Sequence, residues 1–270
     1  MWDGPFFLDI VLSLLACATL VCAIRAFRRG RPRTWQRRLG AAGIIATSLA
    51  VGFGVRQLTL LVSHEFGDGE LAEWQSRRLA MAMHIYLHEH GRLPPAFHPN
   101  RQGRPLLSWR VLLLPYIEHK PLYDQFHLEE PWDSPHNLTL IKKMPLEYLA
   151  PKWGVQPGPS FTYWHAFTGE ATAFVGAEGL QLPGDFPDGP QNTVLLALGG
   201  PAVLWTKPDD IIYGPGIPLP NLYNVLAHGF YVAMGDASVR LVRRGVSEET
   251  IRAAITRNGG EKLDPLWWSH

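Results

Sequence analysis

The sequence predicts an α+β protein in which two N-terminal transmembrane helices precede one globular domain. Three observations lead to this fold class. Two long apolar runs flank a short segment with seven arginines, and a helical pattern follows them. Strand-like segments come later, and residues rich in Gly and Pro separate them. Helices that precede strands are typical of an α+β domain. The two predicted parts are residues 1–63 and residues 64–270.

The first apolar run extends from Pro5 to Ile24, about the 20 residues that cross the hydrocarbon core of a bilayer. A signal peptide is the competing interpretation, but signal peptides carry positive charge before the apolar run, and here acidic residues precede it. The second run extends from Leu39 to Val55 and can continue to Val62. Its small residues fit either close helix packing or the ordinary frequency of Gly and Ala in membrane helices.

Charge is unevenly distributed along the chain. The first 63 residues contain eight Arg and two Asp, whereas residues 64–270 contain 22 Asp and Glu against 17 Lys and Arg. An acidic domain lacks the basic face that neutralises phosphates, so nucleic-acid binding is not expected.

The arginines between the two apolar runs predict the orientation of the chain, because positively charged loops stay in the cytoplasm. We therefore expect the lipid bilayer as a partner, a location in the bacterial cytoplasmic (inner) membrane, and a periplasmic or otherwise extracytoplasmic C-terminal domain. The residues that carry this expectation are Arg25, Arg28, Arg29, Arg31, Arg33, Arg37 and Arg38.

Helical patterns begin the predicted domain. The spacing of apolar residues predicts a long helix from Glu70 to His90 that Gly91 ends. Two short helices are expected at residues 109–116, capped by Ser108, and at residues 134–143. The stripe expected on the long helix contains Leu71, Trp74, Arg78, Ala82, Ile85 and Tyr86.

Strand patterns follow in the second half of the domain. Short apolar stretches between turn residues predict strands from Ala171 to Val175 and from Thr193 to Leu198. A β-hairpin is expected over residues 229–242, with its turn at 235–237. Ser247 is expected to cap a last helix that ends at the Asn-Gly-Gly segment 258–260. These segments predict an antiparallel sheet.

Five segments in order resemble one known family. They are LPPAF (93–97), GRPLLSWRVLLLPYIEHKPLYDQFHLEEPWDSPHN (103–137), WTKPDD (205–210), GFYVAMGDASVRLV (229–242) and ITRNGGE (255–261). Together they resemble the prepilin-type H-X9-DG family of unknown function, which is abundant in planctomycete bacteria. The resemblance implies a pilin-like or pseudopilin-like domain outside the cytoplasm. The matching positions, for which it implies a structural role, are Trp109, Trp132, Asp133, Trp205, Gly235 and Asp236.

The chain departs from the family pattern at the signature motif. Leu226 occupies the position of the signature histidine, ten residues before Asp236, and Ala237 replaces the following glycine. A function tied to that histidine is therefore not expected unless His228 replaces it. No prepilin processing signature precedes either apolar run.

Side chains with possible chemistry have a structural interpretation in each case. His84, His88 and His90 could bind a metal from one helical face, but no third ligand is identified, so neither a metal nor another cofactor is expected. Asp133 and the pair Asp209 and Asp210 lie near tryptophans, as in carbohydrate-active enzymes, yet they also occupy a helix start and a turn.

The sequence favours a structural or interaction protein of the pilin-like type, without enzymatic activity, whose partners are other membrane or pilin-like proteins. The alternative is an extracytoplasmic module that binds a solute or polysaccharide, for which a pocket with convergent polar groups is required. An enzyme would need carboxylates or histidines clustered in a cleft. The aromatic residues considered for solute binding are Trp109, Trp153, Trp164 and Trp205.

Overall fold

The computed structural model describes residues 68–151, 158–264 and 266–268, all within the compact unit Gly67–His270. This part of the chain is a mixed helix-and-sheet domain. None of its helices is long and apolar enough to cross a membrane. The longest, α3 (Asp68–His90), carries charged side chains such as Glu70, Glu73 and Arg77 in its first half.

The predicted fold class is therefore corrected. The structure shows a helix-and-sheet domain in which no described helix meets the length and hydropathy that a membrane span needs. The two apolar runs on which the expectation of transmembrane helices rested, together with the seven arginines between them, lie outside the described residues.

The central sheet has five strands in the order β5-β3-β4-β6-β7. The pairs β3–β4, β4–β6 and β6–β7 are antiparallel, whereas β3 and β5 are parallel. The sheet is thus mixed, and the prediction of an antiparallel sheet was wrong at this edge. The strands are β3 (Phe161–Thr168), β4 (Val194–Leu204), β5 (Ile211–Ile212), β6 (Gly229–Met234) and β7 (Val239–Arg243).

The parallel pair arises from the path of the chain after β4. Leu204 ends β4 opposite Phe161, which begins β3. Residues 205–210 then carry the chain along to Ile211, which pairs with Phe167 near the far end of β3. The connecting segment is part of the family-like WTKPDD stretch, so this stretch determines where Asp210 lies relative to β3.

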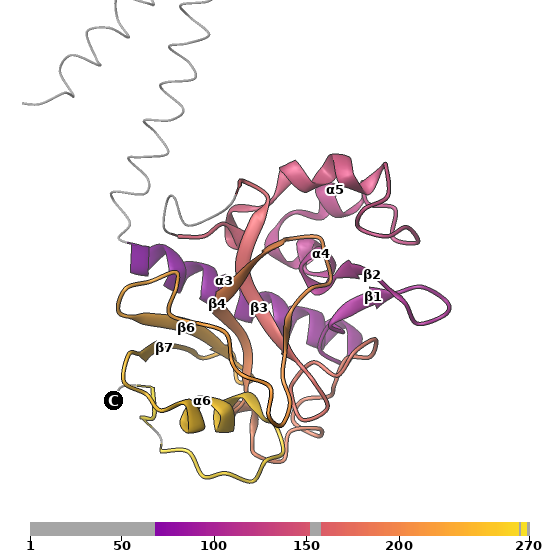
Figure 1. Cartoon of the computed structure of the whole chain (residues 1–270). Coiled ribbons are helices and arrows are strands. Elements are labelled where there is room, and N and C mark those ends of the chain that lie inside the picture. The colour runs from indigo at the N-terminus through magenta and orange to yellow at the C-terminus, as the bar shows by residue number, and fades with distance from the viewer. Residues whose placement is uncertain (1–67, 152–157, 265, 269–270) are drawn as a thin grey trace, which may run out of the picture. The chain divides into compact units, whose positions relative to one another are not determined.

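Helices cover both faces of the sheet (Figure 1). Along β4, Leu196 and Leu198 pack in the core on the α3 side, whereas Ala197 between them packs in the core with α6 (Glu248–Ile255). Successive side chains of a strand point to opposite faces, so this alternation places α3 and α6 on different sides of the sheet. The strand is buried on both faces, which explains why its sequence is almost continuously apolar.

Short elements lie between α3 and the sheet strands in sequence. The predicted helix at 109–116 is broken at Leu113 into α4 and η1, and the predicted helix at 134–143 is a 3-10 helix that begins only at Asn137. Pro115 has no N–H to continue a helical ladder, which accounts for the break. These elements are β1 (Phe97–Pro99), β2 (Pro105–Ser108), α4 (Trp109–Leu112), η1 (Leu114–Ile117), α5 (Lys120–Tyr123), η2 (Asn137–Lys143) and η3 (Leu146–Tyr148), while η4 (Pro190–Asn192) lies between β3 and β4.

The strand predicted from Ala171 to Val175 was wrong. This segment is a turn in which only Phe174 forms a single bridge, to Thr168. The hydroxyl of Thr172 donates to the carbonyls of Gly169 and Phe174, and such local side-chain bonds compete with a strand ladder. The strand predicted from Thr193 to Leu198 is confirmed as the first part of β4, which begins at Val194 and continues to Leu204. The hairpin at 229–242 is confirmed, and β3 was not predicted.

The stripe predicted for α3 also needs correction, because the helix is rotated about its axis. Trp74 and Ile85, expected in the core, are 40% and 39% exposed, although Ala82 is buried. The amide nitrogen of Gln75 donates to the carbonyls of Leu146 and Leu149, which offsets part of the cost of burying this side chain, whereas its Oε1 has no hydrogen-bond partner among the described residues. The buried face contains Ala72, Gln75, Ser76, Leu79, Ala80, Ala82 and Met83.

The hairpin turn yields a first testable prediction. Ala237 adopts a left-handed backbone conformation with φ of 64°, where a side chain is strained. We expect Ala237→Gly to raise the free energy of unfolding by about 1 kcal/mol, measured by urea denaturation. The control is Ala253→Gly inside α6, which should lower it by about 1 kcal/mol. A destabilised Ala237→Gly variant would contradict the strain.

Candidate functional site

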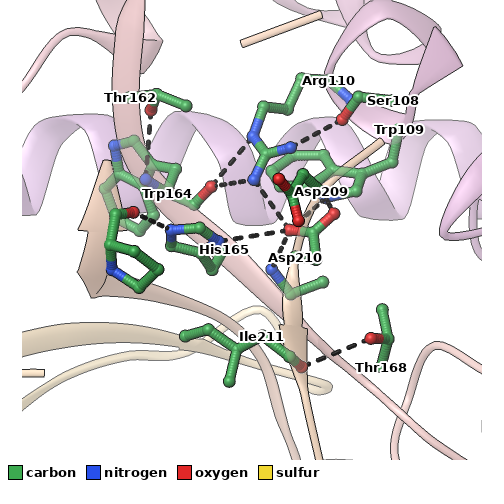
Figure 2. Close-up of polar contacts among 12 residues, drawn as sticks. Ser108, Trp109, Arg110, Thr162, Trp164, His165, Thr168, Asp209, Asp210 and Ile211 are labelled. Atoms are coloured by element: carbon green, nitrogen blue, oxygen red, sulfur yellow. Dashed lines mark hydrogen bonds and ion pairs between the residues drawn. The ribbon is translucent and has the colours of Figure 1, made fainter. Parts of the chain in front are cut away.

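A buried ion pair joins Arg110 to Asp210 at the edge of the sheet (Figure 2). The guanidinium Nη2 lies 2.8 Å from the carboxylate Oδ1, and the two side chains are 0% and 3% exposed. Arg110 lies on α4, and Asp210 is the residue directly before β5. We call the group formed by Ser108, Trp109, Arg110, His165 and Asp210 the buried clasp.

Arg110 uses its guanidinium to hold three segments together. Its Nε donates to the carbonyl of Trp164 on β3 at 2.9 Å, and Nη2 also donates to this carbonyl. Nη1 donates to the hydroxyl of Ser108 at 2.7 Å. The planar fork of arginine suits such simultaneous contacts, which lysine could not reproduce.

Asp210 accepts further hydrogen bonds from the opposite side. The indole Nε1 of Trp109 lies 3.2 Å from Oδ2, and the amide of Ala166 lies 2.9 Å from Oδ1. Burial by itself raises the pKa of Asp210, but the charge of Arg110, together with His165 and the Ala166 amide, outweighs it and lowers the pKa below its usual value. The carboxylate is therefore ionised inside the protein.

His165 completes the clasp from β3. Its Nε2 lies 2.7 Å from the carbonyl of Pro201 and must carry a proton there, because a carbonyl only accepts. Its Nδ1 has no hydrogen-bond partner among the described residues and faces Oδ1 of Asp210 at 3.7 Å. His165 thus binds the Pro201 carbonyl through one ring nitrogen and turns the other towards the carboxylate of Asp210.

Local sequence explains how the two charged residues reach each other. The Ser108 hydroxyl accepts from the backbone N–H of Arg110 and so caps α4, which fixes the start of the helix that carries the guanidinium. At the other end, Asp209 and Asp210 differ sharply in environment. Asp209 is exposed and pairs with Lys207 at 2.7 Å, whereas the Asp210 side chain points into the clasp.

The tryptophans considered for solute binding occupy the core. Trp109, Trp164 and Trp205 are all 0% exposed, and Trp153 lies outside the described residues. The indole Nε1 of Trp205 donates to the carbonyl of Ile141 at 2.7 Å. These three rings are packed against protein and present no surface on which a sugar could stack.

The other family-like positions lie at the periphery. Trp132 is partly buried beneath the ammonium of Lys207, which is 5.9 Å from the ring centroid. Asp133 is exposed. At the hairpin, Oδ1 of Asp236 accepts from the backbone N–H of Ser238 at 2.9 Å. Gly235 lies so close to the backbone of Pro190 that a Cβ atom at this position would clash with it. Leu226 is buried in the core, and His228 is exposed.

The three helix-end histidines are not brought together with other ligands. His90 Nε2 lies 2.8 Å from the hydroxyl of Tyr116, and His88 is exposed. Within the described ranges, no group of three or more His, Cys, Asp or Glu side chains could hold a metal ion.

Sequence reasoning missed Arg110, His165 and Asn137. The buried amide of Asn137 donates to the carbonyls of His127, Glu130 and Pro131 and holds the loop before η2. One available signal was the arginine directly after Ser-Trp in an otherwise apolar stretch. A long charged side chain there is buried only when it is paired.

Two surface hollows are separate from the buried clasp. The larger has a volume of about 1150 Å³ and lies between α6 and the loop after β5, where Tyr213, Glu249 and Glu261 are among the lining residues. The smaller, about 440 Å³, lies beside β7 and is lined by His228, Arg243 and Arg244 among others. None of the five clasp residues lines either hollow.

These features define a helix-and-sheet domain that uses its buried charges to connect its own segments. Residues 73–179 match the model of a family described as a protein of unknown function, DUF1559. The matched range contains the stretches 93–97 and 103–137 on which the family resemblance began, but not the altered signature around Asp236. No curated protein and no solved structure matches the chain.

Proposed function

We propose that this chain is a non-enzymatic interaction protein that binds a protein partner through the exposed face of α3. The observation that supports this most directly is the orientation of the helix. Its buried face contains Gln75 and Ser76, while Trp74 and Met81 face outwards, 40% and 59% exposed. Large apolar side chains that a helix exposes, in addition to those that it buries, are typical of a binding surface.

The exposed side chains of Trp74, Met81 and Ile85 form one line with the half-buried Arg78, and we call these four residues the outer stripe. Positions separated by three and four residues lie above one another on a helix. The guanidinium carbon of Arg78 lies 5.4 Å from the Trp74 ring centroid, so the stripe is continuous across the charged residue. Trp and Arg are also the residues most often found at the energetic centre of interfaces.

The buried clasp supports the same proposal by its location. Asp210 and His165 bring a carboxylate and an imidazole within 3.7 Å of each other, but both side chains are enclosed in protein. A general acid or base must reach the substrate, and these two reach only Arg110, Trp109 and the backbone. Their arrangement favours a structural role.

If the chain were a solute-binding module, the hollow beside α6 would be its candidate binding site. Tyr213 is the single aromatic residue among the described lining residues, and Glu248 and Arg252 there form an ion pair of 2.8 Å with each other. Ligand sites are lined predominantly by apolar and aromatic groups with few polar ones, whereas this lining also contains the charged side chains of Glu170, Glu249, Glu261 and Lys262. The outer stripe therefore supports the interaction role better. Pilin-like partners and an extracytoplasmic location belong to this proposal through the family resemblance.

Photo-crosslinking in cells that produce the full-length chain tests the proposal. A benzophenone amino acid at Met81 should give a discrete protein adduct, and Trp74→Ser together with Ile85→Ser should reduce its yield about tenfold or more. The matched control position is Leu138, which is 48% exposed but lies on η2. The same adducts from positions 81 and 138, or an adduct unaffected by the two serine substitutions, would show that the stripe is not a binding surface.

A further inference from the structure

We infer that the smaller hollow, beside β7, binds the phosphate group of a small phosphomonoester. Its lining consists of Ala227, His228, Leu241, Arg243 and Arg244. Three of these side chains are basic and none is acidic, and we call His228, Arg243 and Arg244 the basic trio. No residue of the outer stripe lines this hollow, so the inference adds a ligand site to the proposed interaction function and does not depend on it.

The register of the β6–β7 hairpin brings the basic trio together. Gly229, which begins β6, pairs with Arg243 at the end of β7, and the backbone N–H of Arg244 donates to the carbonyl of His228 at 3.2 Å. A Cβ atom on residue 229 would lie 2.4 Å from the carbonyl oxygen of Val242, so glycine lets the two strands approach each other here. Because β7 is the edge strand of the sheet (Figure 1), the trio is exposed to solvent.

The guanidinium group of Arg244 is already held in place by the protein. Its Nε donates to the carbonyl of Ala227 at 2.7 Å, and its Nη2 donates to the carbonyl of Tyr223 at 3.0 Å. The guanidinium carbon also lies 5.1 Å from the centroid of the Tyr223 ring. Neither hydrogen bond uses Nη1, whose N–H groups remain for a ligand. A donor that is ordered before binding loses little conformational entropy when the ligand arrives.

The charges of the two arginines are not neutralised by the protein. Arg110 and Arg252 each have a carboxylate oxygen at 2.8 Å, whereas no carboxylate among the described residues forms an ion pair with Arg243 or Arg244. The hollow beside α6, in contrast, is lined by side chains of both signs. A hollow lined by one sign of charge attracts ligands of the opposite sign, so the ligand here is an anion.

Phosphate is the anionic group that fits the basic trio best. Guanidinium groups donate pairs of N–H bonds to phosphate or carboxylate oxygens. A carboxylate offers two oxygens, whereas a phosphomonoester offers three, one for each side chain of the trio. The volume of about 440 Å³ lies within the range of small-molecule sites and leaves room for an organic part beside Ala227 and Leu241. The headgroup of phosphatidic acid has the same chemistry as a soluble phosphomonoester.

Isothermal titration calorimetry of the full-length chain with glycerol 3-phosphate tests this site. The wild type should bind, and Arg243→Gln should weaken binding about tenfold or more because a charged donor is lost. The Arg243 side chain has no hydrogen bond or ion pair to any described residue, so the fold should be unchanged. His228→Gln should also weaken binding. The matched control is Arg104→Gln, an exposed arginine directly before β2 that does not line the hollow and should leave the affinity unchanged.

Dihexanoyl-phosphatidic acid, a water-soluble lipid, distinguishes the two sources of the phosphate. Tighter binding of this lipid than of glycerol 3-phosphate, weakened by Arg243→Gln, would support a lipid headgroup as the ligand. Equal or weaker binding would support a soluble phosphomonoester. A wild-type chain that binds neither probe would overturn the inference, as would acetate that binds as tightly as glycerol 3-phosphate. An equal loss of affinity in Arg104→Gln and Arg243→Gln would also overturn it, because the effect would then come from the overall charge.

Discussion

Asp210→Asn is expected to lower the free energy of unfolding by about 3–5 kcal/mol, because it leaves the fully buried guanidinium of Arg110 without its counter-charge. The substitution preserves the size of the side chain, so the loss reports the charge rather than a cavity. Urea denaturation followed by tryptophan fluorescence measures it. The matched control is Asp209→Asn at the neighbouring exposed position, which should change the stability by less than about 0.5 kcal/mol.

The pH dependence of stability provides the check on this interpretation. The pKa of Asp210 is lowered in the folded protein, below the value of about 3.9 of an unfolded chain. A lowered folded pKa means that the carboxylate contributes its full stability above the unfolded pKa and loses it as the pH falls through the folded value. The difference between wild type and Asp210→Asn should therefore shrink below about pH 4. A difference that stays constant down to pH 2 would exclude the ion pair as its source.

Trp205→Ala is expected to lower the free energy of unfolding by about 3–5 kcal/mol. The ring is fully buried, lies at 5.9 Å and 21° to the ring of Tyr148, and meets Phe126 edge-on at 5.8 Å. Its removal creates a cavity and leaves the carbonyl of Ile141 without its indole donor. Thermal and urea unfolding of the full-length chain measure the loss.

Trp74→Ala is the matched control for Trp205→Ala. Its ring lies on the outer stripe, so truncation should cost less than about 1 kcal/mol of stability while it weakens partner binding. Trp205→Ala thus reports the contribution of core packing to stability, and Trp74→Ala reports the contribution of the outer stripe to partner binding. If Trp205→Ala left the stability nearly unchanged but altered the binding of an added polysaccharide, the solute-binding alternative would replace the interaction proposal.

Elements with short-range signals could be predicted from the sequence. The helix ending at Gly91, the hairpin of β6 and β7 and the helix capped by Ser247 are encoded by neighbouring residues, namely a left-handed glycine, an Asp-containing turn and a side-chain cap. Of the family resemblance, a match of residues 73–179 to a family of unknown function, DUF1559, is shown, whereas its prepilin-type H-X9-DG features stay a prediction. The strand predicted at 171–175 was wrong because the hydroxyl of Thr172 forms hydrogen bonds within the segment and stabilises a turn.

The buried clasp could not be predicted, because its members are far apart in sequence. Arg110 and Asp210 are 100 positions apart, and Arg110 and Trp164 are 54 apart. No local pattern shows that a turn after Lys207 will carry a carboxylate to the start of β5. Asp209 and Asp210 are identical in sequence terms, and only the path of the chain beside β3 exposes one and buries the other.

The sequence alone determined where α3 ends, where the hairpin turn lies and where α6 begins, because capping and glycine conformation depend on adjacent residues. The tertiary structure decided which face of α3 is buried. The apolar spacing of Trp74, Met81 and Ile85 is equally suited to a core and to an interface, and helical periodicity cannot distinguish them. The amide of Gln75 donates to the carbonyls of Leu146 and Leu149, which lie 71 and 74 positions away in sequence, and in this arrangement the outer stripe faces away from the core.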